Sequence, residues 1–333
     1  MAADDRIPVS LLTGFLGSGK TTLLNKTLRA PEMADTAVVV NELGDIGLDH
    51  LLVANAQNSP DDNVVLLNAG CLCCGMLNGF KETLAELYER RTRGEIPEFK
   101  RVIVETTGLA DPAPILQTLL RDSFVAHYFR LAGVVAVIDA VLATESLQHH
   151  DEAQRQTAMA DVLAVSKVDQ TNDEIPETLR DRLVHINPSA NIVAIPNSGT
   201  VPTALMDLFR GEIETAAHAP QGEHIHGHHS RSVRADSFVI DNRVTWPTLA
   251  AWIDFARTHF GRRLLRCKGL IEIAGTGRPT LVQGVQTVFA PPQHLPAWPD
   301  RDHRSRLICI VDGIPAQQVR DSLSLLAAHD DDA

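Results

Sequence analysis

Ten residues near the start of the chain constrain its fold more than any other stretch. They read Thr13-Gly-Phe-Leu-Gly-Ser-Gly-Lys-Thr-Thr22 and match the pattern G-x-x-x-x-G-K-[ST] in full. A short apolar run at residues 7–12 precedes them, and a helix-like segment at residues 22–28 follows. This strand–loop–helix order is the context in which the pattern forms a phosphate-binding loop, so it predicts binding of a nucleoside triphosphate. The alternative is a glycine-rich turn that carries a lysine by chance.

Several residues of this phosphate loop (residues 13–22) have an expected task. The glycines let the backbone turn so that its amides face inward, and the following helix adds the positive end of its dipole. Lys20 would reach the β- and γ-phosphates, and the Thr21 hydroxyl would hold Mg²⁺. The loop residues expected to line the phosphate site are Gly14, Gly17, Ser18, Gly19, Lys20, Thr21 and Thr22.

The composition is that of a globular protein able to bury a sizeable core. Of 333 residues, 44% are hydrophobic and 22% are charged. The net charge of −12 argues against a nucleic-acid partner. No apolar run approaches the roughly 20 residues that a membrane span needs. The first residues lack the layout of a signal peptide, so we expect a cytoplasmic protein.

Apolar runs alternate with helix-like segments up to about residue 210. The expected strands are residues 7–12, 37–41, 64–67, 102–105, 133–139, 162–166 and 192–195. The expected helices between them are residues 76–91, 112–120, 152–159, 176–186 and 202–209. Several strands are continuous Val, Ile and Leu runs, as expected for parallel strands covered on both faces. The alternation predicts a doubly wound α/β domain with a mostly parallel sheet over residues 1–210.

The pattern breaks at residues 211–232, which we interpret as a histidine-rich linker. From residue 233 to residue 327 we expect a strand, a helix, three strands and a helix, which predicts a small α+β domain with its helices on one face of an antiparallel sheet. Its expected elements are residues 237–240, 247–259, 264–274, 280–290, 307–312 and 315–326. Residues 328–333 are expected to form an acidic tail.

A second motif concerns the nucleotide base. Ser166-Lys-Val-Asp169 follows an apolar strand, where GTPases carry Asn-Lys-x-Asp. The Asp169 carboxylate can accept two hydrogen bonds from guanine, a pair that adenine does not offer, and the Lys167 stem would lie along the base. Ser166 stands where an amide is usual, and its shorter side chain is expected to weaken base fixation or relax the preference for guanine.

Two further polar stretches follow predicted strands and resemble nucleotide-sensing switches. The first is Glu105-Thr-Thr-Gly108, in which Gly108 would offer its amide to the γ-phosphate and be released after hydrolysis. The second supplies Glu42, Asp45 and Asp49 near the expected Mg²⁺ and attacking water. For Asp45 and Asp49 a solvated loop is an equal alternative. The residues expected to carry hydrolysis are Lys20, Thr21, Glu42, Asp45 and Glu105.

Three cysteines in four residues, Cys71, Cys73 and Cys74, follow the third predicted strand. Thiolates are soft ligands that suit Zn²⁺ or another late divalent metal. A tetrahedral site needs a fourth ligand, for which Glu42 is our candidate, or an open position from which the metal can be handed on. The alternative is a redox switch through a disulfide between the outer two cysteines.

Four linker histidines offer a second, weaker metal site for Zn²⁺, Co²⁺ or Ni²⁺, or else belong to a solvated linker. These histidines are His224, His226, His228 and His229. Cys267 and Cys309 each lie singly in an apolar strand, and we expect both to be buried core thiols.

Taken together, these motifs resemble the CobW-like P-loop GTPases. The resemblance is carried by the phosphate loop, residues 41–49, the Cys-x-Cys-Cys stretch, residues 105–111 and the histidine-rich linker, and it covers the whole chain. It implies a domain that binds GTP with Mg²⁺, holds Zn²⁺ or Co²⁺ at the Cys-x-Cys-Cys thiolates and hydrolyses GTP slowly. It also implies delivery of the metal to a client protein, with the C-terminal domain as a plausible docking module, by a monomer or a nucleotide-dependent dimer.

The expected mechanism links the two ligands. GTP with Mg²⁺ would order both switches and complete the metal site, and hydrolysis would loosen it. Two other functions remain open. One is a zinc storage or buffering protein, or a redox-regulated GTP-binding protein, without chaperone activity. The other is a P-loop kinase for a small metabolite, which would need neither the thiolates nor the base motif.

Overall fold

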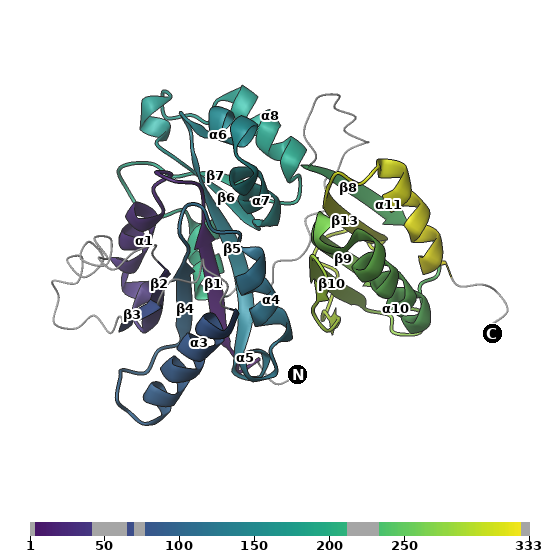
Figure 1. Cartoon of the computed structure of the whole chain (residues 1–333), viewed down its shortest axis with the longest axis horizontal. Helices are drawn as coiled ribbons and strands as arrows, with labels where there is room; N and C mark the ends of the chain where they lie inside the picture. The colour runs from purple at the N-terminus through teal and green to yellow at the C-terminus, as the bar shows by residue number, and fades with distance from the viewer. Residues whose placement is uncertain (1–3, 42–64, 70–76, 212–232, 328–333) are drawn as a thin grey trace. The chain divides into compact units, whose positions relative to one another are not determined.

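The structure is a computed structural model that describes residues 4–41, 65–69, 77–211 and 233–327. Within these ranges the chain forms two compact units, each built on its own β-sheet (Figure 1). None of the helices in the described ranges is both long and apolar enough to span a bilayer.

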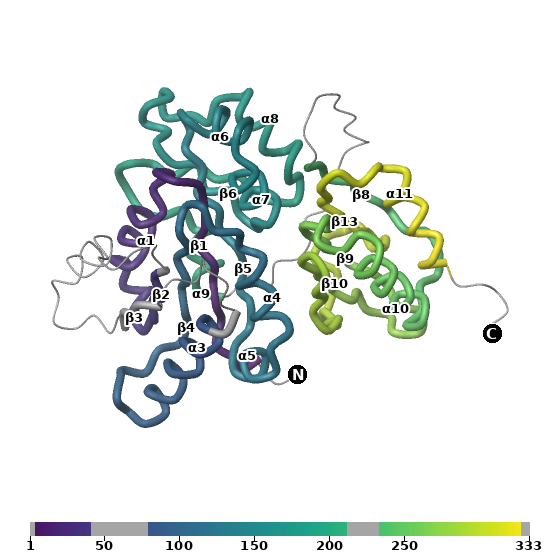
Figure 2. The backbone as a smooth tube through the Cα atoms, viewed as in Figure 1, coloured from purple at the N-terminus to yellow at the C-terminus, as the bar shows by residue number. Residues whose placement is uncertain are grey.

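The sheet of the first unit contains seven described strands, all parallel to their neighbours, in the order β3-β2-β4-β1-β5-β6-β7. In Figure 2 the tube of β1 runs between those of β4 and β5. The strands are β1 Ile7–Thr13, β2 Thr36–Asn41, β3 Val65–Ala69, β4 Arg101–Glu105, β5 Phe129–Asp139, β6 Val162–Ser166 and β7 Asn191–Ala194. The predicted doubly wound, mostly parallel sheet is therefore confirmed.

Helices cover both faces of this sheet. Val135 and Val137 of β5 belong to a core cluster with α1 and α9. Because side chains alternate along a strand, Val134 and Ala136 face the opposite side, and these are also fully buried. The helices that lie wholly in the unit are α1 Lys20–Leu28, α3 Leu77–Thr92, α4 Ala113–Arg121, α5 Ser123–Tyr128, α6 Ala143–His149, α7 Asp151–Met159 and α9 Thr203–Arg210, and α8 Glu177–Ile186 begins in it.

Two of these helices, α5 and α6, are absent from the sequence prediction. Both are shorter than two full turns, so they contain too few residues for a helical period to be recognised. Helix α5 does carry a local start signal, because the Asp122 carboxylate accepts hydrogen bonds from the N–H groups of Phe124 and Val125.

The sheet of the second unit is antiparallel, in the order β11-β10-β9-β13-β8, with β12 paired to β10. The strands are β8 Val233–Ile240, β9 Leu264–Glu272, β10 Pro279–Val285, β11 Val288–Phe289, β12 Gln293–His294 and β13 Ser305–Asp312. The helices are α10 Trp246–Phe255, which continues as a π-helical turn over Ala256–Phe260, and α11 Ala316–Ser322, which continues as a 3₁₀ turn over Leu323–Leu326. The predicted small α+β unit is confirmed.

The single strand predicted for residues 280–290 is wrong. The chain reverses after Val285, with Gln286 in the left-handed region at φ 55°, and Val288 then pairs with Val285. This two-residue turn has no Gly, Asn or Asp, so the sequence gives no turn signal at this point.

The core of this unit lies between the helices and one sheet face. Trp252 of α10 is fully buried, and its indole N–H donates to the Ser322 hydroxyl at 3.2 Å, which joins α10 to α11. Cys267 and Cys309 face each other on β9 and β13 and belong to the same core cluster, as expected of buried thiols.

Candidate functional site

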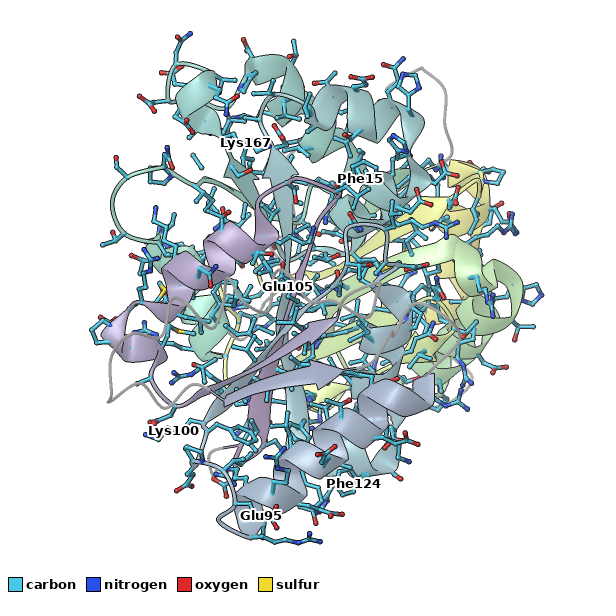
Figure 3. All side chains as sticks on the ribbon, turned by 60° about the vertical axis from the view of Figure 1, so that its left-hand side comes forward. Phe15, Glu95, Lys100, Glu105, Phe124 and Lys167 are labelled. Carbon is cyan, nitrogen blue, oxygen red and sulfur yellow. The ribbon has the colours of Figure 1, made fainter. Side chains whose placement is uncertain are left out.

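Four loops meet at one edge of the parallel sheet. They follow β4, β1, β5 and β6, which are consecutive neighbours in the sheet, and each leaves from the carboxyl end of its strand. In doubly wound folds this edge is where ligands bind. Figure 3 labels Glu105, Phe15 and Lys167, which belong to three of the four loops.

The phosphate loop has a conformation that requires glycine. Gly14 lies at φ 142°, and a Cβ added there would come within 2.4 Å of the Val137 carbonyl oxygen. Gly19, directly before α1, lies at φ 94°. The Lys20 ammonium donates to the carbonyl oxygens of Gly14 at 2.9 Å and Phe15 at 3.2 Å. The lysine is thus held within the loop, where an entering phosphate would meet it.

The first residues of α1 connect this loop to β4. The Thr21 hydroxyl donates to the Glu105 carboxylate at 2.6 Å, and Glu105 is only 4% exposed. With its proton engaged, the Thr21 oxygen keeps lone pairs for a cation. A hydroxyl oxygen backed by a buried carboxylate is a donor set that fits Mg²⁺, which prefers oxygen ligands.

The loop after β4, which we call the switch loop (residues 105–111), lies against the phosphate loop. The Thr106 hydroxyl donates to the Thr13 hydroxyl at 2.9 Å. A Cβ at Gly108 would lie 2.7 Å from the backbone N and Cα of Leu16, so only glycine fits this contact. Among the described residues, nothing accepts a hydrogen bond from the Gly108 N–H. Gly108 itself is buried against Leu16.

The loop after β6 carries the base motif. Ser166 lies within hydrogen-bonding distance of two acceptors, the Ser18 carbonyl at 2.6 Å and the Ile138 carbonyl at 3.2 Å; its single proton favours the shorter contact. The hydroxyl thus contacts the phosphate loop. Lys167 lies in the left-handed region at φ 57°, and Asp169 is exposed in a short 3₁₀ turn, Val168–Gln170.

Sequence reasoning missed Asp139, the residue that fixes Lys167. Its carboxylate pairs with the Lys167 ammonium at 2.6 Å and accepts from the N–H groups of Val141 and Leu142. Burial acts to raise the pKa of Asp139, but the hydrogen bonds from Lys167 and from these two amides outweigh it and hold that pKa below its ordinary value. The available signal was an acid that ends strand β5, just as Glu105 ends β4.

Several predicted site residues lie outside the described residues. They are Glu42, Asp45, Asp49, Cys71, Cys73, Cys74, His224, His226, His228 and His229. The residues that the structure does describe contain no group of three or more potential ligands that could hold a metal ion.

The strands that lead to the first six of these residues are described. Asn41 at the end of β2 pairs with Ala69 at the end of β3, and Val40 pairs with Glu105 at the end of β4. The chain therefore enters residue 42 and residue 70 from adjacent points, beside the carboxylate that accepts from Thr21.

Family comparisons cover both units. Residues 8–194 match the family model described as CobW/HypB/UreG, nucleotide-binding domain, and residues 233–326 match the cobalamin synthesis protein cobW C-terminal domain. The zinc chaperone YjiA of Escherichia coli (strain K12) is 30% identical over 316 residues, which are 94% of this chain and 96% of that protein. Zinc-regulated GTPase metalloprotein activator 1 of Schizosaccharomyces pombe is 33% identical over 196 residues, which are 57% of this chain and 46% of that protein.

Comparison with solved structures identifies the same relative, YjiA. Two crystal structures of zinc-bound YjiA GTPase, one of them of a triple mutant, superpose with a TM-score of 0.75 and 26% identity. Each covers 97% of this chain and 99% of the solved chain. With both family domains matched in order, the chain belongs to the CobW family of P-loop GTPases.

Proposed function

We propose that this protein is a GTP-dependent metallochaperone. It would bind GTP with Mg²⁺, hold a Zn²⁺ or Co²⁺ ion at Cys71, Cys73 and Cys74, and release the ion to a client protein when GTP is hydrolysed. The observation that carries the proposal is the register of three adjacent strands. In this register β2 and β3, which lead into the two segments with the expected metal ligands, end next to the end of β4. The last residue of β4 is Glu105, which accepts a hydrogen bond from Thr21 of the phosphate loop.

On the nucleotide side, described residues supply the binding groups. Lys20 and the loop amides would bind the phosphates, and Thr21 with Glu105 would hold Mg²⁺, which would neutralise charge on the β- and γ-phosphates. The Gly108 N–H would meet a γ-phosphate oxygen. Asp169 would accept from guanine, with Lys167 held in place for the base by Asp139.

On the metal side, the ion is cargo. Three thiolates and Glu42 would make a four-ligand site for Zn²⁺, and the linker histidines would capture the ion before transfer. The relatives' names, zinc chaperone and metalloprotein activator, support this choice of cargo and the existence of a client. We assign residues 1–210 to the GTPase domain, 211–232 to the linker and 233–327 to a domain that docks the client.

Coupling would follow from the shared edge of the sheet. A γ-phosphate that orders the switch loop would also restrict residues 42 onward, because β2 and β4 are paired up to Val40 and Glu105. Such coupling is reciprocal, so bound metal would tighten GTP binding by the same factor by which GTP tightens metal binding.

Zinc affinity in two nucleotide states tests the proposal. Competition with a chromophoric chelator would be measured in a non-hydrolysable GTP analogue with Mg²⁺ and in GDP, for the native chain and for a Cys71→Ala/Cys73→Ala/Cys74→Ala variant. The proposal predicts at least tenfold tighter binding with the analogue, which is about 1.4 kcal/mol of coupling, and its loss in the variant.

The nucleotide dependence, and not zinc binding alone, is the decisive readout. The YjiA triple mutant replaces a glutamate and two cysteines with alanine and is still zinc-bound in its crystal, so a residual zinc site can survive such changes. A variant with the four linker histidines changed to glutamine is the matched control, since it should lose only weak zinc binding. Zinc affinity that ignores the nucleotide would instead indicate a metal buffer or a redox-regulated GTPase.

A further inference from the structure

Helix α7 contacts the switch loop through one buried amide side chain. The Nε2 group of Gln156 donates to the Gly108 carbonyl at 3.1 Å and to the Ala110 carbonyl at 3.0 Å. Gln156 is 1% exposed, and its partners lie 48 and 46 positions away in the chain. Carbonyl oxygens can only accept, so the amide nitrogen must face them and the orientation of the side chain is fixed by chemistry.

These two hydrogen bonds fix the position of Leu109, which lies between the two acceptor residues Gly108 and Ala110. Leu109 is held with its side chain 46% exposed, while the Gly108 carbonyl is engaged and its N–H has no partner among the described residues. The switch loop is thereby kept in one conformation, with Gly108 against Leu16 of the phosphate loop.

The buried amide of Gln156 is only partly satisfied by the described residues. The Gln156 Oε1 atom is buried, and the described residues give it no hydrogen-bond partner. A buried acceptor without a partner costs free energy, which offsets part of what the two hydrogen bonds to Gly108 and Ala110 contribute. Where a residue departs from good packing in this way, a functional role is the expected compensation.

The same helix also contacts the phosphate loop. His150, directly before α7, stacks on Phe15 with ring centroids 4.5 Å apart and an interplanar angle of 30°. Arg155 of α7 pairs with Asp111 at the end of the switch loop, at 3.5 Å. Helix α7 is therefore the element that joins the loop expected to cradle the phosphates to the loop expected to sense the γ-phosphate.

We propose that Gln156 is a positioning residue that preorganises the switch loop for the γ-phosphate. The proposal rests on the GTP-binding role given above. Without the two amide bonds, the loop would occupy several conformations, and the γ-phosphate would have to order it on binding. GDP lacks the γ-phosphate that would meet the Gly108 N–H, so its affinity should not change.

The test uses Gln156→Met in the full chain, because methionine keeps the length and volume of the side chain and removes both donors. Gln154→Met is the matched control. Gln154 lies on the same helix, is 3% exposed and donates to the Leu147 carbonyl of α6 at 2.8 Å, away from the switch loop. Fluorescent GDP and a fluorescent non-hydrolysable GTP analogue, both with Mg²⁺, would be titrated into each variant.

We expect Gln156→Met to weaken binding of the analogue about tenfold, equivalent to about 1.4 kcal/mol, and GDP binding less than twofold. Gln154→Met should change both affinities less than twofold. Equal weakening of both nucleotides, no change, or tighter binding of the analogue in Gln156→Met would overturn the proposal. If that variant fails to fold, Gln156→Glu serves in its place, since it has the same shape and cannot donate to both carbonyls.

The two proposals fail in distinguishable ways. If the native chain does not bind the GTP analogue, the proposed function is wrong and this inference falls with it. If the native chain binds the analogue and Gln156→Met discriminates the nucleotides as the native chain does, only the role of Gln156 is wrong.

Discussion

The Ser166→Ala variant removes one hydroxyl and distinguishes two possible roles of Ser166, which are to hold the phosphate loop or to bind the nucleotide base. In the structure the Ser166 hydroxyl lies 2.6 Å from the Ser18 carbonyl oxygen of the phosphate loop. A partly buried neutral hydrogen bond contributes about 1 kcal/mol net, which corresponds to a change of about fivefold in an equilibrium constant. If the bond preorders the phosphate loop, GDP and a GTP analogue should both bind about fivefold more weakly in the variant.

The decisive comparison is selectivity. Because the hydroxyl contacts the phosphate loop, the ratio of GTP to ATP affinity should stay within twofold of the native value. Competition of unlabelled GTP and ATP against fluorescent GDP measures this ratio directly. An Asp169→Ala variant is the positive control, since loss of the carboxylate should reduce guanine preference more than tenfold. A change of this ratio in Ser166→Ala would instead assign Ser166 a direct role at the base.

Two further variants test other contacts of the site. Asp139→Asn keeps an oxygen for the N–H groups of Val141 and Leu142 but turns an N–H₂ group toward Lys167, so unfolding by urea at pH 7 should show a loss of about 1 kcal/mol, discounted for the exposure of the lysine. The pKa of Asp139 is lowered in the folded state, so its carboxylate contributes its full stabilisation of the fold above the unfolded pKa of about 3.9, and this stabilisation is lost as the pH falls through the folded pKa. The difference in unfolding free energy between Asp139→Asn and the native chain should therefore shrink below about pH 4, and an undiminished difference there would contradict this assignment. Gly108→Ala places a Cβ 2.7 Å from the backbone of Leu16, so it should displace the switch loop. Single-turnover GTP hydrolysis should slow about tenfold, while GDP affinity should stay within twofold of the native value. Unchanged hydrolysis would show that the contact between Gly108 and Leu16 is not needed.

Sequence patterns predicted the parallel sheet well because its strands are buried, continuous apolar runs. The prediction began β5 at residue 133, whereas the strand starts at Phe129. Arg130 interrupts the apolar run there, so the run alone could not mark the start. Patterns also could not show the turn at Gln286, which has no residue typical of a two-residue hairpin.

In the candidate site, residues of contiguous motifs could be predicted from the sequence, but their distant partners could not. Lys20 and Thr21 are recognisable because a contiguous motif fixes their spacing around one ligand. The partners that orient the motifs are not contiguous with them. Asp139 lies 28 positions from Lys167, and Gln156 lies 48 positions from Gly108, so each contact depends on the order of the strands and on the packing of α7. A single sequence carries no signal for such pairings beyond an acid at the end of a strand.

If GTP hydrolysis releases the metal, zinc should leave the protein in step with hydrolysis, and a single-turnover release experiment measures both. Protein loaded with Zn²⁺ and GTP·Mg²⁺ would be mixed with excess chromophoric chelator, with zinc capture and phosphate production followed in parallel. We expect zinc to leave at the rate of GTP hydrolysis, and at least tenfold more slowly when a non-hydrolysable analogue replaces GTP. Zinc release at one rate in GTP, in the analogue and in GDP would contradict it.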